Sequence, residues 1–325
     1  MLDFVYLLVG IGLLTAGGEF LIRGALGVSN KIGMSPLLSG LIIVGFGTSM
    51  PELVVSVDAA LSGQSDIAIG NVVGSNIANI LLILGICAAI TPLAISPLSL
   101  RRDALVVMAA SFLFILLAFD GSLDIIDAII LLTLLVLYLL WAYWADSKSL
   151  VISAEALPSE VHKAVAAEIT VIPKSIVWIV AEVVGGLVFL ISGSQILLKG
   201  AIGIAGGLGV SEAVIGLTLV AVGTSLPELT ISVMAALRKH ADVAVGNVLG
   251  SNIFNLLGIL GVSAILQPID VKGRVVVFDQ WVMLGVSMLL YLFLFTSRQL
   301  SRVEGVLLLL GYFAYLGISY TYFSG

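Results

Sequence analysis

Charged residues are scarce in this chain, since Asp, Glu, Lys and Arg together make up only 10% of its 325 residues. Hydrophobic residues make up 60%, and the mean hydropathy is +1.21. This composition excludes a soluble globular domain and predicts a polytopic membrane protein. The longest polar stretch, residues 145–173, is too short to bury a core of its own. We therefore expect no separate cytosolic domain.

Nitrogen and sulfur ligands are also scarce, with two histidines and one cysteine in the whole sequence. His162 and His240 fall in predicted loops, and the chain contains no HExxH motif, which argues against a zinc hydrolase. Cys87 cannot form a disulfide within the chain, and its apolar surroundings predict a packed, inert thiol. We expect neither catalytic residues nor a resident cofactor, so the protein is predicted not to be an enzyme.

Long apolar runs are abundant. A helix that crosses a bilayer needs about 20 mostly apolar residues. We place ten such segments, at residues 3–22, 35–61, 66–91, 104–119, 124–144, 174–198, 211–237, 242–266, 276–297 and 303–322. The first segment lacks a basic leader and a cleavage site, so we interpret it as a retained helix.

The basic residues predict the orientation in the membrane. If the N-terminus is outside, only Lys199, Lys272 and Arg274 of the 14 Lys and Arg residues lie on the outer face. Cytoplasmic loops normally hold the excess of Lys and Arg. The sequence therefore predicts a multi-pass protein of the plasma membrane with both termini outside.

One block of sequence occurs twice. The segment GFGTSMPELVVSV at residues 45–57 returns as AVGTSLPELTISV at residues 221–233. The segment GNVVGSNIAN at residues 70–79 returns as GNVLGSNIFN at residues 246–255. The offset is 176 residues in both cases, which indicates that a whole structural unit has been duplicated.

The duplication predicts the architecture. Each copy would hold five of the ten spans, and an odd number inverts the second copy relative to the first. We predict an all-α membrane protein with ten transmembrane helices in two inverted five-helix repeats, residues 1–144 and 174–325. A short cytoplasmic linker, residues 145–173, would join them, and broken helices would surround a cation site at the membrane midplane.

Two glutamates, Glu52 and Glu228, occupy equivalent positions in the two copies and lie inside strongly apolar runs. An ionised carboxylate there is costly, so something positive is expected to meet it. Pro51 and Pro227 directly precede them and should break their helices, because proline removes a backbone donor. Carbonyls freed at such breaks can coordinate a cation where they face a cavity.

Further oxygen-bearing side chains accompany the glutamates. Threonines stand four residues before them, and in each following helix a serine and an asparagine four residues apart share one face. Glycines in the GNxxG segments would let the helices approach closely. An all-oxygen set selects hard cations, and a flexible one suits calcium or sodium better than magnesium. The candidates are Thr48, Thr224, Ser75, Ser251, Asn79 and Asn255.

The same residues allow less specific interpretations. Intramembrane serine and threonine often bond carbonyls of their own helix, and asparagine often joins two helices. Asn76 and Asn252 lie on a different helix face, so we expect them to bond between helices. Asn71 and Asn247 are expected to satisfy backbone groups at the breaks. An oxygen-lined site can also belong to a channel, although the inverted duplication favours alternating access.

The pattern GTSxPE followed by GNxxGSNxxN, present twice, resembles the two alpha-repeats of the sodium/calcium exchanger family of cation/calcium antiporters. The resemblance is strict in the repeated blocks and general over the ten-helix plan. It implies that Glu52 and Glu228 are the central calcium ligands and that the first and sixth helices slide across the rest. It also implies that the other ion contacts are Thr48, Thr224, Ser75, Ser251, Asn79, Asn255 and the carbonyls of Gly45 and Ala221.

This resemblance implies an antiporter that exchanges Ca²⁺ for Na⁺ by alternating access, electrogenically if more than two sodium ions replace each calcium ion. Potassium-dependent relatives carry an aspartate where this chain has Asn255, so we expect no dependence on K⁺. Proton/calcium exchangers usually carry a glutamate where this chain reads Gly74-Ser75-Asn76, and H⁺/Ca²⁺ antiport is the alternative. The expected partners are the two ions and the bilayer, without nucleic acid, and a monomer is expected to suffice for transport.

Overall fold

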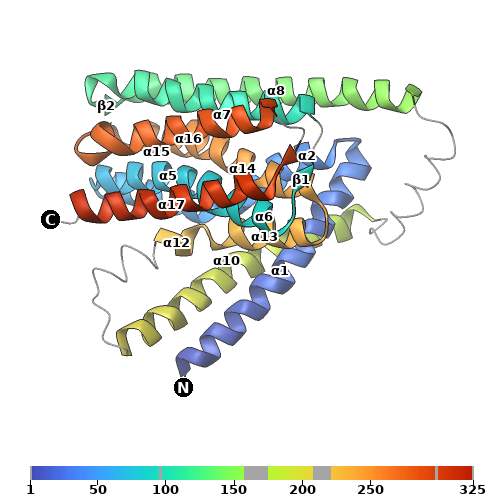
Figure 1. Ribbon diagram of the computed structural model, residues 1–325, viewed down its shortest axis with the longest axis horizontal. Coiled ribbons are helices and arrows are strands. Elements are labelled where there is room, and N and C mark those ends of the chain that lie inside the picture. Colours follow the sequence, from blue (N-terminus) through green and yellow to red (C-terminus); the bar gives the residue numbers. More distant parts are fainter. Residues whose placement is uncertain (1, 95–96, 157–174, 208–220, 297–298, 324–325) are drawn as a thin grey trace.

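The computed structural model describes residues 2–94, 97–156, 175–207, 221–296 and 299–323, and nearly all of them are helical. Most of the long helices run side by side along the long axis of the molecule (Figure 1). The uninterrupted ones are α1 (Leu2–Ile32), α7 (Pro97–Leu117), α8 (Ile125–Ala156), α10 (Ile176–Gly207), α16 (Gln280–Thr296) and α17 (Arg302–Phe323). Short helical turns, η3 (Ala118–Asp120) and η6 (Val275–Asp279), extend α7 and precede α16.

The repeated blocks form interrupted helices. In the first repeat these are α2 (Pro36–Ser39), η1 (Gly40–Gly45), α3 (Phe46–Thr48) and α4 (Met50–Leu61), then α5 (Ser65–Ala78), η2 (Asn79–Leu84) and α6 (Gly85–Ile90). In the second they are α12 (Ala221–Thr224) and α13 (Leu226–Leu237), then α14 (Ala241–Ile253), η5 (Phe254–Ile259) and α15 (Leu260–Leu266). The segments η1, η2, η5 and η6 are π-helical, a widening of the helix that is frequent at functional sites.

Eight of the described helices are long and apolar enough to cross a bilayer, and the pair Pro36–Thr48 and Met50–Leu61, bent by 44°, makes a ninth. The all-α membrane architecture is therefore confirmed, while the count of ten is not confirmed within the described residues. The predicted span at residues 211–237 lies partly outside them. Its described part consists of α12 and α13.

The predicted linker begins as a helix. No glycine or proline interrupts the chain between the predicted end of the fifth span at residue 144 and Pro158, so α8 continues to Ala156. The other residues of the linker, 157–173, lie outside the described part of the chain. The first residues of the linker therefore extend α8.

Helices that are equivalent under the 176-residue offset pack together. α1 packs on α10 and α7 packs on α16, which joins equivalent helices of the two repeats. α6 of the first repeat packs on α17 of the second, and their equivalents, α15 and α8, pack on one another in the same way. The strand β1 (Leu93–Ala94) pairs with β4 (Gln299–Leu300), and β2 (Ser122–Leu123) pairs with β3 (Ile269–Asp270) in the same exchanged relation. The two repeats therefore interlock (Figure 1).

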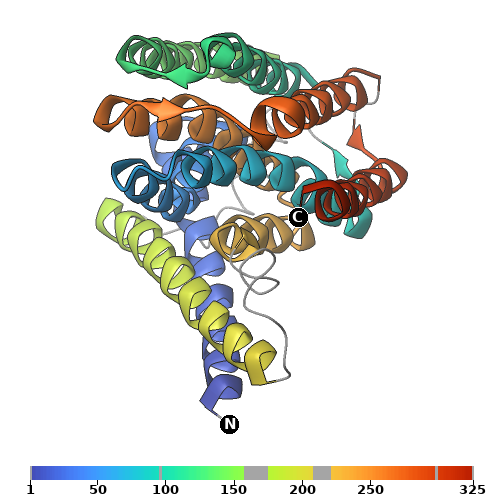
Figure 2. The same cartoon turned by 90° about the vertical axis from the view of Figure 1, so that its left-hand side faces the viewer.

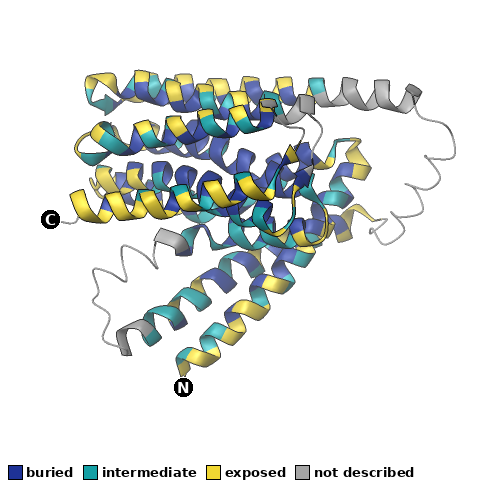
Figure 3. Ribbon diagram, in the orientation of Figure 1, coloured by how far each residue is buried: buried dark blue, intermediate teal, exposed yellow. Residues whose placement is uncertain are grey.

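Burial places the repeated blocks at the centre of the molecule. Every residue of α14 from Val243 to Ile253 is buried, whereas α17 exposes large apolar side chains such as Leu310 and Phe313 (Figure 3). Exposed apolar side chains on fully hydrogen-bonded helices are what lipid contact requires. The polar residues of the repeated blocks are therefore shielded from lipid by the helices around them.

The pair α1 and α10 projects at one end from the other helices (Figure 2), while α1 also packs on α2 and α13. Its close packing depends on glycine, because a Cβ atom on Gly17 would lie 2.8 Å from the Leu190 amide nitrogen. Glu19 on α1 forms an ion pair with Arg23 at 2.6 Å, one turn further along the same helix, and another with Arg238 at the end of α13. α1 thus has both an apolar partner in α10 and a polar tie to the core.

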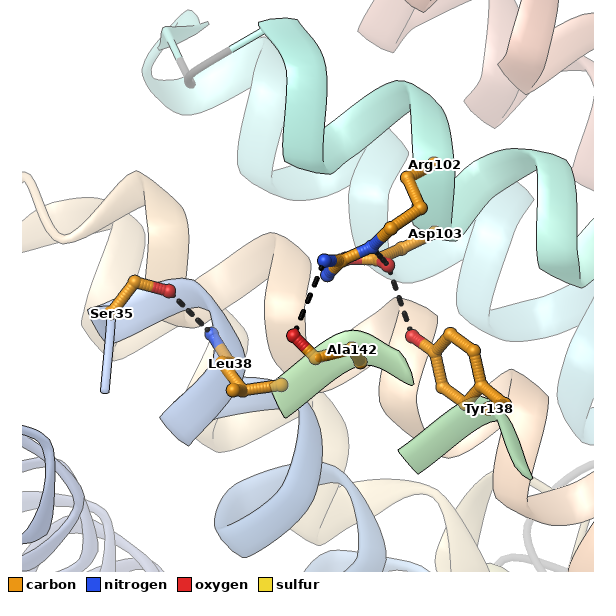
Figure 4. A network of polar contacts seen from close by, with 6 residues as sticks. All are labelled: Ser35, Leu38, Arg102, Asp103, Tyr138 and Ala142. Carbon is orange, nitrogen blue, oxygen red and sulfur yellow. Dashed lines mark hydrogen bonds and ion pairs between the residues drawn. The ribbon is translucent and has the colours of Figure 1, made fainter. Parts of the chain in front are cut away.

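Asp103 is a fully buried acid whose charge is compensated locally. Arg102 donates to it at 2.5 and 3.0 Å, and the Tyr138 hydroxyl on α8 donates at 3.0 Å (Figure 4). The same guanidinium donates to the Ala142 carbonyl at 3.5 Å, which ties α7 to α8. Nearby, the Ser35 hydroxyl caps α2 by accepting from the Leu38 amide at 3.1 Å (Figure 4).

Asp279, the repeat equivalent of Asp103, is held in a similar way. Arg274 donates to it at 2.9 Å, and the Tyr315 hydroxyl on α17 also donates at 2.9 Å. Each repeat thus places an arginine and a tyrosine around an equivalent aspartate, although the arginine comes from a different position in each. Because their charges are already paired, neither aspartate is a candidate ligand for a transported cation.

Candidate cation-binding site

The predicted helix breaks lie directly before the two glutamates. α3 ends at Thr48 and α4 begins at Met50, with Ser49 between them at φ −82° and ψ 9°. In the second repeat Ser225 separates α12 from α13 at φ −88° and ψ 9°. The following prolines occupy the first turn of the new helix, where the missing N–H is tolerated. The prediction that these helices break is therefore confirmed.

Glu52 and Glu228 lie in the first turns of α4 and α13, and each is only 1% exposed. A helix N-terminus carries a partial positive charge, which favours a carboxylate at this place. Within the described part of the chain, neither glutamate forms an ion pair. If these carboxylates are ionised, the positive charge that balances them comes from outside these helices.

Each glutamate is held by a serine of the opposite repeat. The Ser49 hydroxyl donates to Oε1 of Glu228 at 2.9 Å, and the Ser225 hydroxyl donates to Oε1 of Glu52 at 3.2 Å. The Oε2 atoms of both glutamates are buried and have no hydrogen-bond partner among the described residues. A buried carboxylate oxygen without a donor is costly, and a cation between the two repeats would compensate both.

The first-repeat threonine and the second-repeat serine meet at one carbonyl. Ser251 Oγ donates to the Gly45 carbonyl at 3.0 Å, and Thr48 Oγ1 lies 3.4 Å from the same oxygen. Thr48 also donates to Oδ1 of Asn247 at 3.1 Å. Both hydroxyls are buried. Three predicted contacts, Gly45, Thr48 and Ser251, are thus brought together. The Thr48 hydroxyl bonds a carbonyl of its own helix segment, as the less specific interpretation predicts, whereas the Ser251 hydroxyl bonds a carbonyl of the other repeat.

The remaining hydroxyls lie around Glu52. Ser225 Oγ is 3.5 Å from Ser75 Oγ, which places the predicted Ser75 beside the glutamate's own partner. The Thr224 side chain lies close to the Glu52 carboxylate. Ala221, whose carbonyl was predicted as a ligand, is the first residue of α12. The first repeat's glutamate is therefore surrounded by hydroxyls from both repeats.

The asparagines divide into two kinds. Asn79 donates to Oδ1 of Asn252 at 3.0 Å, and Asn252 donates to the Asn76 carbonyl at 3.4 Å, so these residues join α5 and η2 to α14. The interhelical role predicted for Asn252 is confirmed. Asn255 is 1% exposed, and neither atom of its amide has a partner among the described residues. The Oδ1 atoms of Asn79 and Asn255 therefore remain free to contact a cation, while the Asn255 Nδ2 can only donate.

The glycines predicted to allow close approach do so in the second repeat. A Cβ on Gly250 would lie 2.2 Å from the Leu41 carbonyl oxygen, and one on Gly246 would lie 2.5 Å from the Leu37 carbonyl oxygen. α14 therefore packs directly on the backbone of α2 and η1. The segment that would pack on Gly70 and Gly74 in the same way lies largely outside the described residues.

Comparison with known proteins identifies the family. A family model described as sodium/calcium exchanger protein matches residues 2–144 and 178–321. The chain belongs to the sodium/calcium exchanger family. It is therefore a cation/Ca²⁺ antiporter with a multi-pass membrane fold.

Individual relatives agree over nearly the full length. The sodium/calcium exchanger MaX1 of Methanosarcina acetivorans is 31% identical, with 97% of each chain covered. The inner membrane protein YrbG of Escherichia coli is 33% identical and covers 98% of this chain and 97% of its own. The solved structure of the sodium-calcium exchanger NCX_Mj soaked with zero Na⁺ and Ca²⁺ superposes with a TM-score of 0.83 at 31% identity, covering 97% of this chain and 98% of that one.

Sequence reasoning missed Ser49 and Ser225 as contacts in this exchanger. Both stand within the GTSxPE motif, and each bonds the carboxylate of the other repeat. The sequence did contain a signal, because a serine stands two residues before the proline in both copies. The described residues contain no cluster of three or more His, Cys, Asp or Glu side chains. The candidate site thus offers two carboxylates with hydroxyl, amide and carbonyl oxygens, a set that would suit a hard cation.

Proposed function

We propose that this exchanger moves Ca²⁺ in one direction and Na⁺ in the other through a single site centred on Glu52 and Glu228. The observation that carries the proposal is the exchange of serine donors, in which each repeat holds the glutamate of the other. A cation bound between the two free Oε2 atoms would contact both repeats. Two carboxylates balance one Ca²⁺, and the same oxygens serve Na⁺ when calcium leaves, so the ions compete.

The proposed ligands are the residues gathered around this centre. The hydroxyls of Ser75 and Ser251 and the carbonyls of Gly45 and Ala221 would form flanking sodium sites on the two sides of the glutamates. Thr48, Thr224, Asn79 and Asn255 would complete the central coordination. Ser49 and Ser225 join this set because their hydroxyls lie against the carboxylates.

The arrangement supports alternating access. The two repeats are inverted, so a change that opens the site to one side has an equivalent that opens it to the other. The equivalent helices α1 and α10 pack chiefly on one another, and the pair projects at one end from the interlocked helices. We propose that this pair moves against the rest and that a monomer in the plasma membrane, with both termini outside, completes the cycle.

Sodium coupling is proposed over proton coupling. The segment Gly74-Ser75-Asn76 offers no carboxylate, and MaX1 and NCX_Mj are both described as sodium/calcium exchangers. The test is calcium-45 uptake into proteoliposomes loaded with sodium, beside vesicles with a proton gradient and no sodium. Uptake driven by outward sodium supports the proposal. Uptake driven by the proton gradient alone would assign the protein to H⁺/Ca²⁺ antiport instead.

We propose that more than two sodium ions replace each calcium ion, because oxygens flank the glutamates on both sides. Each net charge moved then responds to voltage at about 2.3 kcal/mol per 100 mV. Sodium-driven calcium uptake should accordingly change when a potassium gradient and valinomycin set the membrane potential. Uptake that does not respond to the imposed potential would show an electroneutral exchange.

Potassium is expected to leave transport unchanged. Asn255 supplies a neutral amide, so the site lacks a third carboxylate to balance an additional K⁺. The initial rate of sodium-driven calcium uptake should be equal when external choline is replaced by K⁺, with the potential clamped in both cases. Strong activation by K⁺ would contradict this prediction.

A further inference from the structure

We propose that Asn71 and Asn247 are positioning residues that set the affinity of the exchanger for Ca²⁺ by clamping the helical turns that carry Glu52 and Glu228. Neither asparagine belongs to the ligands proposed above. The inference rests on the proposed function, because it assumes that the two glutamates bind the cation. It adds a pair of residues that act through the glutamates and do not touch the ion.

In the second repeat, the clamp is formed by one amide group and two acceptors. Asn247 Nδ2 donates to the backbone carbonyl of Glu228 at 3.1 Å and to Oγ of Ser232 at 2.8 Å. Ser232 Oγ in turn lies 3.4 Å from the Ala244 carbonyl. Asn247 is fully buried on α14. Both N–H groups of this amide are therefore used on α13, across the contact between the two helices.

The first repeat contains the same three-part contact. Asn71 Nδ2 donates to the Glu52 carbonyl at 3.2 Å and to Oγ of Ser56 at 2.9 Å. Ser56 Oγ lies 3.3 Å from the Ala68 carbonyl. The two glutamates are thus held by equivalent asparagines through equivalent bonds. Such agreement between two inverted copies indicates a requirement of the site rather than an accident of packing.

The place of the clamp explains its effect. Each glutamate lies in the first turn after a helix break, where the backbone has few intrahelical bonds to hold it. The asparagine bonds residues i and i+4 of this turn, Glu52 with Ser56 or Glu228 with Ser232, and so fixes one full turn against the neighbouring helix. The direction of the carboxylate follows from the position of its own backbone. Loss of the clamp would let the carboxylate turn away from the ion.

Asn247 also connects the two repeats. Its Oδ1 accepts from Thr48 Oγ1 at 3.1 Å, while its Nδ2 holds the carbonyl of Glu228. One side chain therefore places a hydroxyl of the first repeat relative to the glutamate of the second. This connection requires an amide, because a carboxylate in the same place has no N–H to donate.

The test measures Ca²⁺ affinity separately from stability, with purified full-length protein in lipid nanodiscs. Calcium-45 equilibrium binding and thermal unfolding without Ca²⁺ are recorded for Asn71→Ala, Asn247→Ala, Ser56→Ala and Ser232→Ala. Loss of a side chain that orients a metal ligand typically weakens binding about 10- to 100-fold, and we expect this for the asparagine variants. The serine variants keep the bond to the glutamate carbonyl and should lose roughly threefold, as expected for one hydrogen bond.

The matched controls are Ser111→Ala and Ser287→Ala. These two serines are also buried and repeat-equivalent, and their hydroxyls lie 3.3 Å apart on α7 and α16. Their other hydrogen bonds go to carbonyls of their own helices and not to either glutamate. Their variants should change unfolding temperature without changing Ca²⁺ affinity. If the asparagine variants behave like these controls, the positioning role is wrong. If an asparagine variant does not fold, unchanged affinity in Ser56→Ala and Ser232→Ala overturns the proposal.

Glu52→Gln in the same assay distinguishes failure of the glutamate site from failure of the asparagine clamp. If Glu52→Gln loses binding while Asn71→Ala and Ser56→Ala bind as the original protein does, only the clamp is refuted. If Glu52→Gln itself binds Ca²⁺ normally, the assignment of the glutamate site is wrong, and the clamp proposal that depends on it is wrong as well. Loss in Glu52→Gln together with graded losses in the asparagine and serine variants supports both.

Discussion

Glu52→Gln and Glu228→Gln are each expected to abolish Ca²⁺ transport. Glutamine keeps the size of the side chain and removes one of the two negative charges that balance the ion. Removing one partner of a buried charge pair costs roughly 3–5 kcal/mol, which lowers affinity by at least about a hundredfold. The measurement is sodium-driven calcium-45 uptake by proteoliposomes that contain equal amounts of each protein.

Asp58→Asn is the matched control for this experiment. Asp58 lies on α4 like Glu52, six residues further along, but its side chain is exposed. Neutralising it should leave uptake close to that of the original protein, because an exposed charge is screened by water and salt. Retained uptake in either glutamine variant would contradict the site, because both glutamates have buried, unpaired Oε2 atoms that require compensation.

Gly250→Ala is expected to prevent assembly of the site. The new methyl group would lie 2.2 Å from the Leu41 carbonyl oxygen and 2.7 Å from the Leu41 Cα, and backbone atoms cannot turn away as a side chain can. Overpacking of this kind costs about 1–3 kcal/mol or more. Because Ser251 follows directly and donates to the Gly45 carbonyl, the displacement would also separate the ligands. We expect a lower unfolding temperature and loss of Ca²⁺ binding.

Gly285→Ala provides the comparison. Gly285 lies within α16, is exposed, and has no described atom within 4 Å of the position of an added Cβ. Alanine favours a helix over glycine by about 1 kcal/mol, so this variant should be as stable as the original protein or slightly more so. Equal stability and equal binding in Gly250→Ala and Gly285→Ala would show that the close contact of α14 with η1 is not needed.

The features that sequence predicts best are those with a local cause. The proline before each glutamate interrupts its helix whatever the tertiary packing, because the cause lies in the proline ring itself. The structure has the breaks at Ser49 and Ser225. The cost of a charge in an apolar run likewise follows from the run itself. The long apolar segments and the duplication could also be predicted, because both are properties of the residue order and do not depend on how the helices pack.

Contacts between the repeats could not be predicted in this way. The bond from Ser49 to Glu228 depends on how two inverted units pack, and that packing is determined by backbone contacts such as those at Gly250. The hydrogen bonds of Asn71 and Asn247 were expected at the backbone, but the carbonyls that accept them, those of the glutamates, emerge only from the structure.

Identical residues in the two repeats also differ in their surroundings. Asn79 bonds Asn252, whereas its equivalent Asn255 has no partner among the described residues. The repeat sequences are nearly the same here, so sequence predicts the same environment for both. The two repeats are therefore not fully symmetric at this point. The asymmetry concerns the amide nitrogens, since the Oδ1 atoms of both asparagines have no partner among the described residues.

The central claim is that two glutamates from opposite repeats form one calcium site. Equilibrium binding of calcium-45 to purified protein tests it most directly, with the number of ions bound per chain measured for the original protein, Glu52→Gln and Glu228→Gln. Our account predicts one Ca²⁺ per chain in the original protein and none in either variant at concentrations that saturate the original. Two ions per chain, with one retained in each variant, would show two independent sites and contradict it.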